Sequence, residues 1–379
     1  MKTADVIVVG GGVMGCSIAY HLSLQKCRVI LLERDSQLAT GSTGRCSGGI
    51  RHQFSNPVNV QLSIESIRKL KAFEQEIGCQ IDLHQDGYLF LLTRPESVAE
   101  FSHSIAMQRH LGVESRLLDR KEVESLAPSV FLGDVLAGAY CPDDGIVDPY
   151  GVTAGYAAKA RELGAEILLN QDVIAIDSFN GHVAGVRTQK AAFAAPVVVN
   201  AAGPWAAPLA RLAGVTLPVA PYRRHVYITR EFPEVPRTRL MVIDFETSFY
   251  FHREGQGVLM GMSDPSEPSS FTDTVEPAFL DQVIDVGVRR FPPLAAASIR
   301  RAWAGLYEVT PDANPILDET PLRGFYFAGG FSGHGFMHGP IVGELMAELI
   351  LKQEPHIDLS GFSLERFSTE TLPPESNVV

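Results

Sequence analysis

The feature that most constrains this chain is a glycine-rich turn between an apolar strand and a helix near its start. Residues 4–9 are rich in valine and isoleucine and hardly alternate, which predicts a strand buried on both faces of a parallel sheet. The next residues, Gly10-Gly11-Gly12-Val13-Met14-Gly15, carry the spacing G-x-G-x-x-G. In such a turn Gly10 permits the tight bend, Gly12 permits a close approach of the backbone to a pyrophosphate, and Gly15 permits the helix to pack on the strand. The turn therefore predicts a dinucleotide site.

An acidic residue at the end of a second strand narrows the choice of dinucleotide. The helix that follows the turn offers phosphate its unpaired N–H groups and the positive end of its dipole. Residues 28–33 predict another buried strand, which ends in Glu33. A carboxylate there can accept hydrogen bonds from ribose hydroxyls, and it would repel the 2′-phosphate of NADP. NAD and FAD remain.

A glycine- and serine-rich loop over residues 41–51 distinguishes these two. A nicotinamide-binding domain would continue into further βα units at this point. This loop instead suits an extended ligand that carries phosphates, which favours FAD bound at full length.

Composition sets the remaining limits. A chain of 379 residues exceeds what one hydrophobic core usually supports, so two lobes are expected. No apolar run approaches the ~20 residues of a membrane span, and we see no export signal, so a cytoplasmic location is expected. The net charge of -12 disfavours nucleic acid as a partner. The five cysteines form no C-x-x-C pair, which argues against a disulfide framework, a dithiol centre and a metal site.

The rest of the chain alternates between two kinds of pattern. Strand-then-helix patterns return at residues 149–170, 195–214 and 324–351, whereas the segments between them alternate as antiparallel strands do. Residues 255–261 imitate a dinucleotide fingerprint, but no helix follows, so a hairpin turn is expected. We therefore expect an α/β fold with added antiparallel strands. Its discontinuous, Rossmann-like dinucleotide domain would comprise residues 1–75, 141–215 and 309–379, and its mixed-sheet substrate domain residues 76–140 and 216–308.

Six sequence blocks, in this order, resemble FAD-dependent amine and amino-acid oxidoreductases of the D-amino-acid oxidase (DAO) superfamily. The similarity is greatest to the β subunits of sarcosine oxidase and proline dehydrogenase. The blocks are the fingerprint with Glu33, "GSTGRCSGGIRHQFS" from Gly41, "DDGIVDPYGVTAGYAAKARELGAEI" from Asp143, "VVNAAGPWA" from Val198, "WAGLYEVTPDANPI" from Trp303 and "GFYFAGGFSGHGFMHGP" from Gly324.

The resemblance implies which residues hold FAD. Val173 resembles a valine whose backbone meets the adenine, Gly203 resembles the glycine of a second flavin-facing turn, and residues 330–337 resemble the loop beneath the flavin ring. A helix N-terminus in that loop would stabilise the negative charge of the reduced ring, and Pro340 is expected in its first turn. The implied FAD contacts are Gly10, Gly12, Val13, Met14, Gly15, Glu33, Arg34, Ser42, Thr43, Arg45, Cys46, Ser47, Gly49, Val173, Ala202, Gly203, Trp205, Gly305, Gly330, Gly333, His334, Gly335, Phe336 and Met337.

Three positions depart from the covalent members of the family. Arg45 stands where some members attach FAD through a histidine, and Gly305 stands where others use a cysteine. Pro149 matches the histidine that attaches FMN in the sarcosine oxidase β subunit. Noncovalent FAD is therefore expected.

The implied activity is oxidation of the C–N bond of a secondary amine or α-amino acid, such as sarcosine or proline, by hydride transfer to flavin N5. The resulting imine would hydrolyse, and electrons would pass to O2 or to a partner subunit. Two alternatives stay open. The first alternative is that the chain is the FAD-bearing β subunit of a heteromeric amino-acid or opine dehydrogenase. The second is that it is a dinucleotide-binding module without turnover.

Four residues are predicted to act on the substrate. Arg51 offers a planar, bidentate cation for a carboxylate, although an arginine on the surface or on an FAD phosphate is the alternative. Tyr250 is a hydroxyl candidate or a core tyrosine. His334 would polarise the cofactor or move a proton, and Glu308 would contact the substrate amine or pair with an arginine. Arg223 and Arg224 are weaker candidates, because strand alternation points at most one of them inward.

Overall fold

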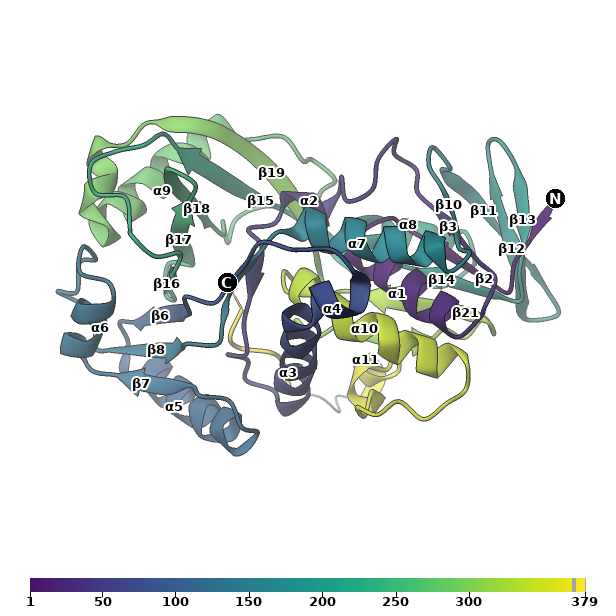
Figure 1. The fold of residues 1–379 in the computed structure, drawn as a ribbon, viewed down its shortest axis with the longest axis horizontal. Helices are drawn as coiled ribbons and strands as arrows, with labels where there is room; N and C mark the ends of the chain where they lie inside the picture. Colours follow the sequence, from purple (N-terminus) through teal and green to yellow (C-terminus); the bar gives the residue numbers. More distant parts are fainter. Residues whose placement is uncertain (370–372, 379) are drawn as a thin grey trace.

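The computed structural model describes residues 1–369 and 373–378. Its first sheet has six strands in the order β10-β3-β2-β14-β21-β20 (Figure 1). All neighbours are parallel except β20 and β21. The bounds are β2 (Val6–Val9), β3 (Val29–Leu32), β10 (Glu166–Leu168), β14 (Val197–Asn200), β20 (Ile316–Glu319) and β21 (Phe325–Gly329).

Both faces of this sheet are covered, which explains the continuous apolar runs of its strands. Val6 and Val8 pack into one core with helix α1 (Val13–Leu24), which lies between α7 (Pro149–Glu162) and α10 (Gly335–Ile350). Ile7 and Val9 point the other way, into a second core. The second core is covered by α8 (Ala206–Arg211) and by a four-stranded sheet of β1 (Lys2–Thr3), β13 (Ala192–Ala194), β12 (His182–Thr188) and β11 (Val173–Phe179).

The second large sheet has eight strands in the order β19-β15-β18-β17-β16-β6-β8-β7. It is mixed, because β16 and β6 are parallel and the other neighbours are antiparallel. The hairpin of β17 and β18 turns at Gly255, so the predicted hairpin over residues 255–261 is confirmed. The bounds are β6 (Tyr88–Leu92), β7 (Arg116–Leu118), β8 (Ala137–Cys141), β15 (Ala220–Thr229), β16 (Met241–Asp244), β17 (Phe249–Glu254), β18 (Gly257–Met262) and β19 (Ile299–Val309).

The remaining elements connect and flank these sheets. None of the helices in the described part of the chain is both long enough and apolar enough to cross a membrane. A small sheet holds β4 (Gly49–Ile50), β9 (Gly145–Val147) and β5 (Leu83–His84). The other helices are α2 (Ser42–Arg45), α3 (Pro57–Lys71), α4 (Phe73–Ile77), α5 (Pro95–His110), α6 (Arg120–Leu126), η1 (Gly203–Trp205), α9 (Pro277–Arg290), η2 (Pro292–Ala296), η3 (Ser360–Phe362) and α11 (Arg366–Thr369).

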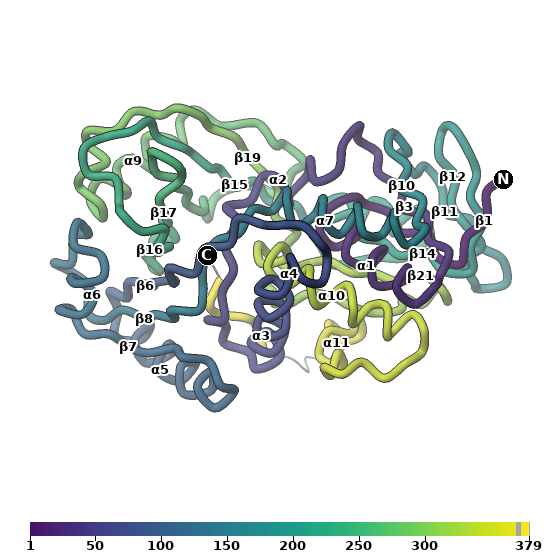
Figure 2. Tube along the Cα trace, viewed as in Figure 1, coloured from purple at the N-terminus to yellow at the C-terminus, as the bar shows by residue number. Residues whose placement is uncertain are grey.

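The two chain ends lie far apart. The N-terminus lies beside the four-stranded sheet, whereas the last described residues run back to the middle of the molecule (Figure 2). There Glu375 accepts hydrogen bonds from Ser55 and Asn59, which lie just before and within α3.

One prediction about α10 is wrong. The helix begins at Gly335, so Pro340 lies inside it, in the second turn rather than the first. Because proline has no N–H, the carbonyl of Phe336 loses its usual helical partner there.

Candidate functional site

A cavity of about 560 Å³ extends from the carboxyl ends of β2 and β3 to the eight-stranded sheet. Its first end contains the glycine-rich turn and Glu33, and its other end contains Arg51, Arg224 and Tyr250. A position beyond the carboxyl ends of parallel strands is the usual ligand site of an open α/β sheet.

The glycine-rich turn is tight because two of its residues have no room for a side chain. Gly10 has φ +116°, and a Cβ there would overlap the carbonyl of Ala201. A Cβ on Gly15 would overlap the carbonyl of Gly10. No side chain caps the start of α1, so its first N–H groups stay available to a ligand, apart from that of Val13, which donates to Thr43 Oγ1 at 3.1 Å.

Glu33 links this turn to the end of β3. Its Oε2 accepts a hydrogen bond from the N–H of Gly11 at 2.6 Å, and its Oε1 accepts one from the N–H of Asp35 at 2.8 Å. Burial raises the pKa of Glu33, and these two hydrogen bonds oppose the shift. The carboxylate is thus fixed on the cavity wall, where a ribose could reach it.

Arg34 and Trp205 form a flat part of the wall. The guanidinium carbon of Arg34 lies 3.6 Å from the centroid of the Trp205 ring. Both residues line the cavity together with Val173.

The loop after β3 is fastened to the eight-stranded sheet through Arg45. This side chain pairs with Asp273 at 2.6 Å and donates to the carbonyl of Ala304 at 2.9 Å. Its own carbonyl accepts a hydrogen bond from the Trp303 ring at 2.9 Å, and a Cβ on Gly305 would lie 3.0 Å from its Cβ. Arg45 therefore positions the loop.

Two side chains of the cavity lining, Glu308 and His334, have buried polar atoms that lack a hydrogen-bond partner among the described residues. These atoms are Glu308 Oε2 and both ring nitrogens of His334. Burial raises the pKa of Glu308 to about 7, although the N–H groups of Gly330 and Phe331 favour its ionised form. Burial lowers the pKa of His334 well below its usual range, and the neighbouring His338 adds to this, so the imidazole is neutral. Both side chains can therefore form hydrogen bonds with a polar ligand in the cavity.

Arg51 dominates the far end of the cavity. It is only 4% exposed, and it donates to the backbone carbonyls of Gln53 and, at 2.5 Å, Asn377. No carboxylate of the described residues pairs with it. Burial lowers its pKa. A buried guanidinium held only by neutral acceptors favours binding of an anion.

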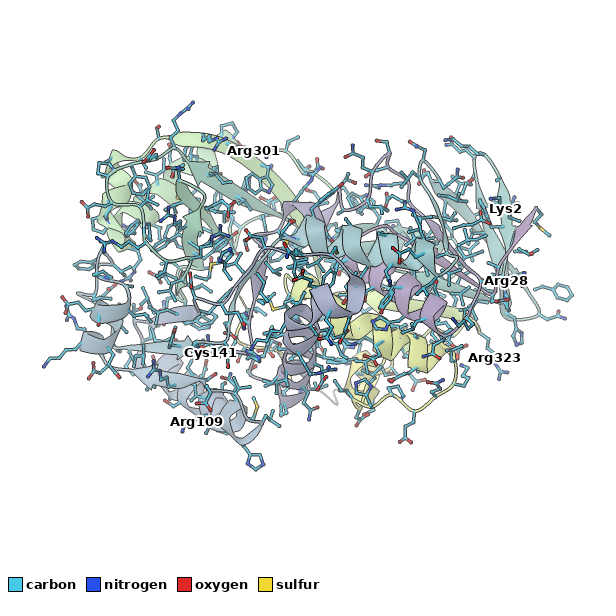
Figure 3. All side chains as sticks on the ribbon, viewed as in Figure 1. Lys2, Arg28, Arg109, Cys141, Arg301 and Arg323 are labelled. Carbon is cyan, nitrogen blue, oxygen red and sulfur yellow. The ribbon has the colours of Figure 1, made fainter. Side chains whose placement is uncertain are left out.

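A hydrogen-bonded cluster around Asp144 involves the two residues that follow Arg51. Asp144 accepts from both the N–H and the Nδ1 of His52 at 2.7 Å and from the Gln53 amide at 3.0 Å. Cys141, which ends β8 (Figure 3), lies 3.9 Å from the same ring nitrogen. His52, Cys141 and Asp144 are close enough to share a metal ion, but the carboxylate is already occupied by three donors.

Most of the predicted site residues line this single cavity. Gly15 and Gly330 do not line it: Gly15 packs under the turn, and Gly330 packs against Thr310. The wall includes Gly10, Gly12, Val13, Met14, Glu33, Arg34, Ser42, Thr43, Arg45, Cys46, Ser47, Gly49, Arg51, Val173, Ala202, Gly203, Trp205, Tyr250, Gly305, Glu308, Gly333, His334, Gly335, Phe336 and Met337.

The cavity residues that sequence reasoning did not name include Tyr88, Tyr307 and Val378. Tyr307 lies within the "WAGLYEVTPDANPI" block, so its position was a usable signal. Tyr88 covers Gly49 with its hydroxyl, and Val378 comes from the last described segment. Arg224 lines the cavity whereas Arg223 pairs with Glu267, in agreement with the expectation that at most one of them points inward.

The cavity suits a flavin dinucleotide. The glycine turn, the uncapped starts of α1 and α10, and the unpartnered atoms of Glu308 and His334 all face one continuous space. The fold and site thus define a dinucleotide-dependent oxidoreductase. The family profile "FAD dependent oxidoreductase" (DAO) matches residues 5–349, and the chain belongs to this family. The predicted family, α/β fold and FAD cofactor are confirmed.

Known proteins resemble the chain over nearly its full length. It is 31% identical to the mitochondrial sarcosine dehydrogenase of Homo sapiens, over 97% of this chain and 42% of that protein. It is also 31% identical to the FAD-dependent oxidoreductase domain-containing protein 1 of Xenopus laevis, over 100% and 85%. The chain thus spans less than half the length of the sarcosine dehydrogenase. Among solved structures, L-proline dehydrogenase from P. horikoshii has a TM-score of 0.91 at 33% identity, over 98% of this chain and 99% of that chain.

Proposed function

We propose that the protein oxidises the C–N bond of a secondary amine or α-amino acid of the sarcosine or proline type, with noncovalent FAD. The observation that carries this proposal is Arg51, a buried cation that pairs with no carboxylate of the described residues, in the same cavity as the turn of His334. The substrate becomes an imine, which water hydrolyses to a carbonyl compound and an amine. FAD, when bound, supplies the two-electron oxidant.

The side chains of the cavity have distinct tasks in this proposal. Arg51 binds the substrate carboxylate through its free N–H groups. Burial raises the pKa values of Tyr250 and Tyr307, so both hydroxyls keep their protons and can donate hydrogen bonds. Glu308 and neutral His334 lie beside glycine residues of the cavity lining, where they accept hydrogen bonds from the cofactor or donate hydrogen bonds to it.

The test is anaerobic reduction of the FAD-loaded protein by a panel of sarcosine, proline, glycine, hydroxyproline and opines. We expect at least one of these amines to bleach the visible flavin absorbance, at a rate that rises with pH as the substrate ammonium loses its proton. If none of them reduces the flavin, the proposal is wrong. Gel filtration of the protein from its native source would distinguish a self-sufficient enzyme from the β subunit of a larger dehydrogenase. The second possibility is raised by the similarity of the sequence blocks to such β subunits.

A further inference from the structure

The charges along the cavity wall are unequally balanced. Four arginines line the cavity: Arg34, Arg45, Arg51 and Arg224. Arg34 lies 3.8 Å from Asp35, and Arg45 lies 2.6 Å from Asp273. Neither Arg51 nor Arg224 pairs with a carboxylate of the described residues. Two of the four cations are therefore uncompensated, in the sense that no carboxylate of the described residues forms an ion pair with them, although Glu375 and Asp144 act on Arg51 electrostatically.

Arg224 contrasts with its neighbour on β15. Arg223 points away from the cavity and forms a buried ion pair with Glu267 at 3.0 Å. Within the part of the chain that the structure describes, Arg224 donates only to the backbone carbonyl of Arg223, at 2.9 Å, and its buried Nε has no partner. Leaving a guanidinium N–H buried and unpaired is unfavourable unless a ligand satisfies it.

The two uncompensated arginines lie near the same tyrosine. The guanidinium carbon of Arg224 lies 5.0 Å from the centroid of the Tyr307 ring. Both Arg224 and Arg51 also act electrostatically on the Tyr307 hydroxyl, opposing the rise in its pKa that burial causes. The other cations labelled in Figure 3, such as Arg109, Arg301 and Arg323, are exposed at the periphery. Arg51 and Arg224 thus lie close enough to one tyrosine to act on it together.

We propose that Arg224 forms a second carboxylate subsite, so that the preferred substrate is an amino acid that carries two carboxylates. This inference rests on the proposed function. One carboxylate pairs with Arg51 and the other with Arg224, which compensates both charges. A substrate such as sarcosine, with a single carboxylate, leaves one guanidinium unpaired.

The second carboxylate has two chemical sources. It is either on the nitrogen substituent, as in iminodiacetate, or on the amino-acid side chain, as in glutamate. Anaerobic flavin reduction compares iminodiacetate with sarcosine, and glutamate with alanine. Preference for the dicarboxylate in either pair supports the proposal and identifies the source, whereas no preference in both pairs overturns it.

Binding of ligands that cannot be oxidised separates this proposal from the proposed function. The FAD-loaded protein is titrated with thiodiacetate and with (methylthio)acetate, and affinity is measured by calorimetry. We expect thiodiacetate to bind about tenfold tighter, and Arg224→Met to remove that advantage while changing the affinity for (methylthio)acetate by less than about twofold. Arg223→Met is the matched control and should alter neither affinity.

Three results would overturn the second subsite. They are equal affinities for the two ligands, an equal loss of both affinities in Arg224→Met, and a weakened affinity for FAD in that variant, which would make Arg224 a cofactor contact. If no amine reduces the flavin but thiodiacetate keeps its advantage through Arg224, the proposed oxidation fails while the subsite stands.

Discussion

Arg51 Nη2 donates a hydrogen bond of 2.5 Å to the backbone carbonyl oxygen of Asn377. One partner follows strand β4 in the first part of the chain, and the other lies in the last described segment. Val378, the next residue, lines the cavity. The segment thus contributes to the cavity lining and holds Arg51, which we assign to the substrate carboxylate.

The first prediction concerns Arg51 itself. Replacing it by methionine removes a charge-assisted, bidentate contact, so kcat/KM should fall by a factor on the order of 100, with a smaller fall in Arg51→Lys. FAD content should stay unchanged. The measurement is steady-state or stopped-flow kinetics with the best substrate of the panel. Arg109→Met, at an exposed position on α5, is the control. An unaltered kcat/KM in Arg51→Met would remove this residue from the substrate site.

The second prediction concerns Glu375, which anchors the last segment. Its carboxylate accepts from the N–H and hydroxyl of Ser55 at 2.7 and 2.6 Å and from Asn59 at 2.9 Å. In Glu375→Gln an amide N–H2 would face these donors, so we expect a loss of about 1–3 kcal/mol in stability. The substrate KM should rise, and limited proteolysis should cleave this segment faster. Glu354→Gln, at an exposed position, serves as the control, and equal proteolysis of the two variants would contradict the anchoring role.

The dinucleotide half of the cavity was predictable because its signals are local. Gly10 has a positive φ that glycine adopts readily, Gly15 has no room for a side chain against the carbonyl of Gly10 in the same turn, and Glu33 follows the very next strand. Such short-range requirements leave a spacing that can be read from the sequence.

The substrate half was less predictable because it depends on long-range placement. Alternation along β15 predicts that Arg223 and Arg224 face opposite ways, but only the folded structure, in which Arg224 lines the cavity and Arg223 pairs with Glu267, shows which one faces it. Nothing in the pattern around Asn377 indicates that it meets Arg51. The expected place of Pro340 in the first turn of α10 was wrong, because the helix begins at Gly335 and the proline lies in the second turn.

The third prediction concerns Glu33 and the affinity for FAD. Glu33→Ala removes the acceptor for the N–H of Gly11 and the carboxylate that faces the ribose position. Because hydrogen bonds to charged groups contribute roughly 1.5–3 kcal/mol, the Kd for FAD should rise by a factor of about 10–100. Titration of apoprotein with FAD, followed by flavin fluorescence, measures this, and circular dichroism checks the fold. The Kd of Glu33→Gln should lie between those of the wild type and Glu33→Ala. An unchanged Kd in Glu33→Ala would contradict the assignment of Glu33 to the FAD site.

The fourth prediction is that acid releases the flavin. Arg45 is paired with Asp273 and Gly305 has no side chain, so neither can attach the cofactor. Cys46 lines the cavity, but burial raises its pKa to about 12, and a thiol in that state is a poor nucleophile. After acid precipitation the yellow colour should therefore stay in the supernatant. Colour retained in the pellet would show a covalent bond, and peptide mapping would locate it.

The fifth prediction follows from the carboxyl group of Glu308. Burial raises its pKa from 4.5 to about 7 in the folded protein, so the folded state holds this proton more tightly than the unfolded chain does. The stability that the proton contributes is complete below pH 4.5 and is lost as the pH rises through about 7.

In the FAD-free protein, Glu308→Gln should remove this loss, because the amide cannot ionise. The variant should gain on the order of 2 kcal/mol over the wild type between about pH 5 and 8, a value reduced by water that screens the cavity wall. Thermal unfolding across this pH range measures the difference, with Glu231→Gln, an exposed carboxylate, as the control. A constant difference in Tm between Glu308→Gln and the wild type would mean that Glu308 is already ionised in the folded protein near pH 5.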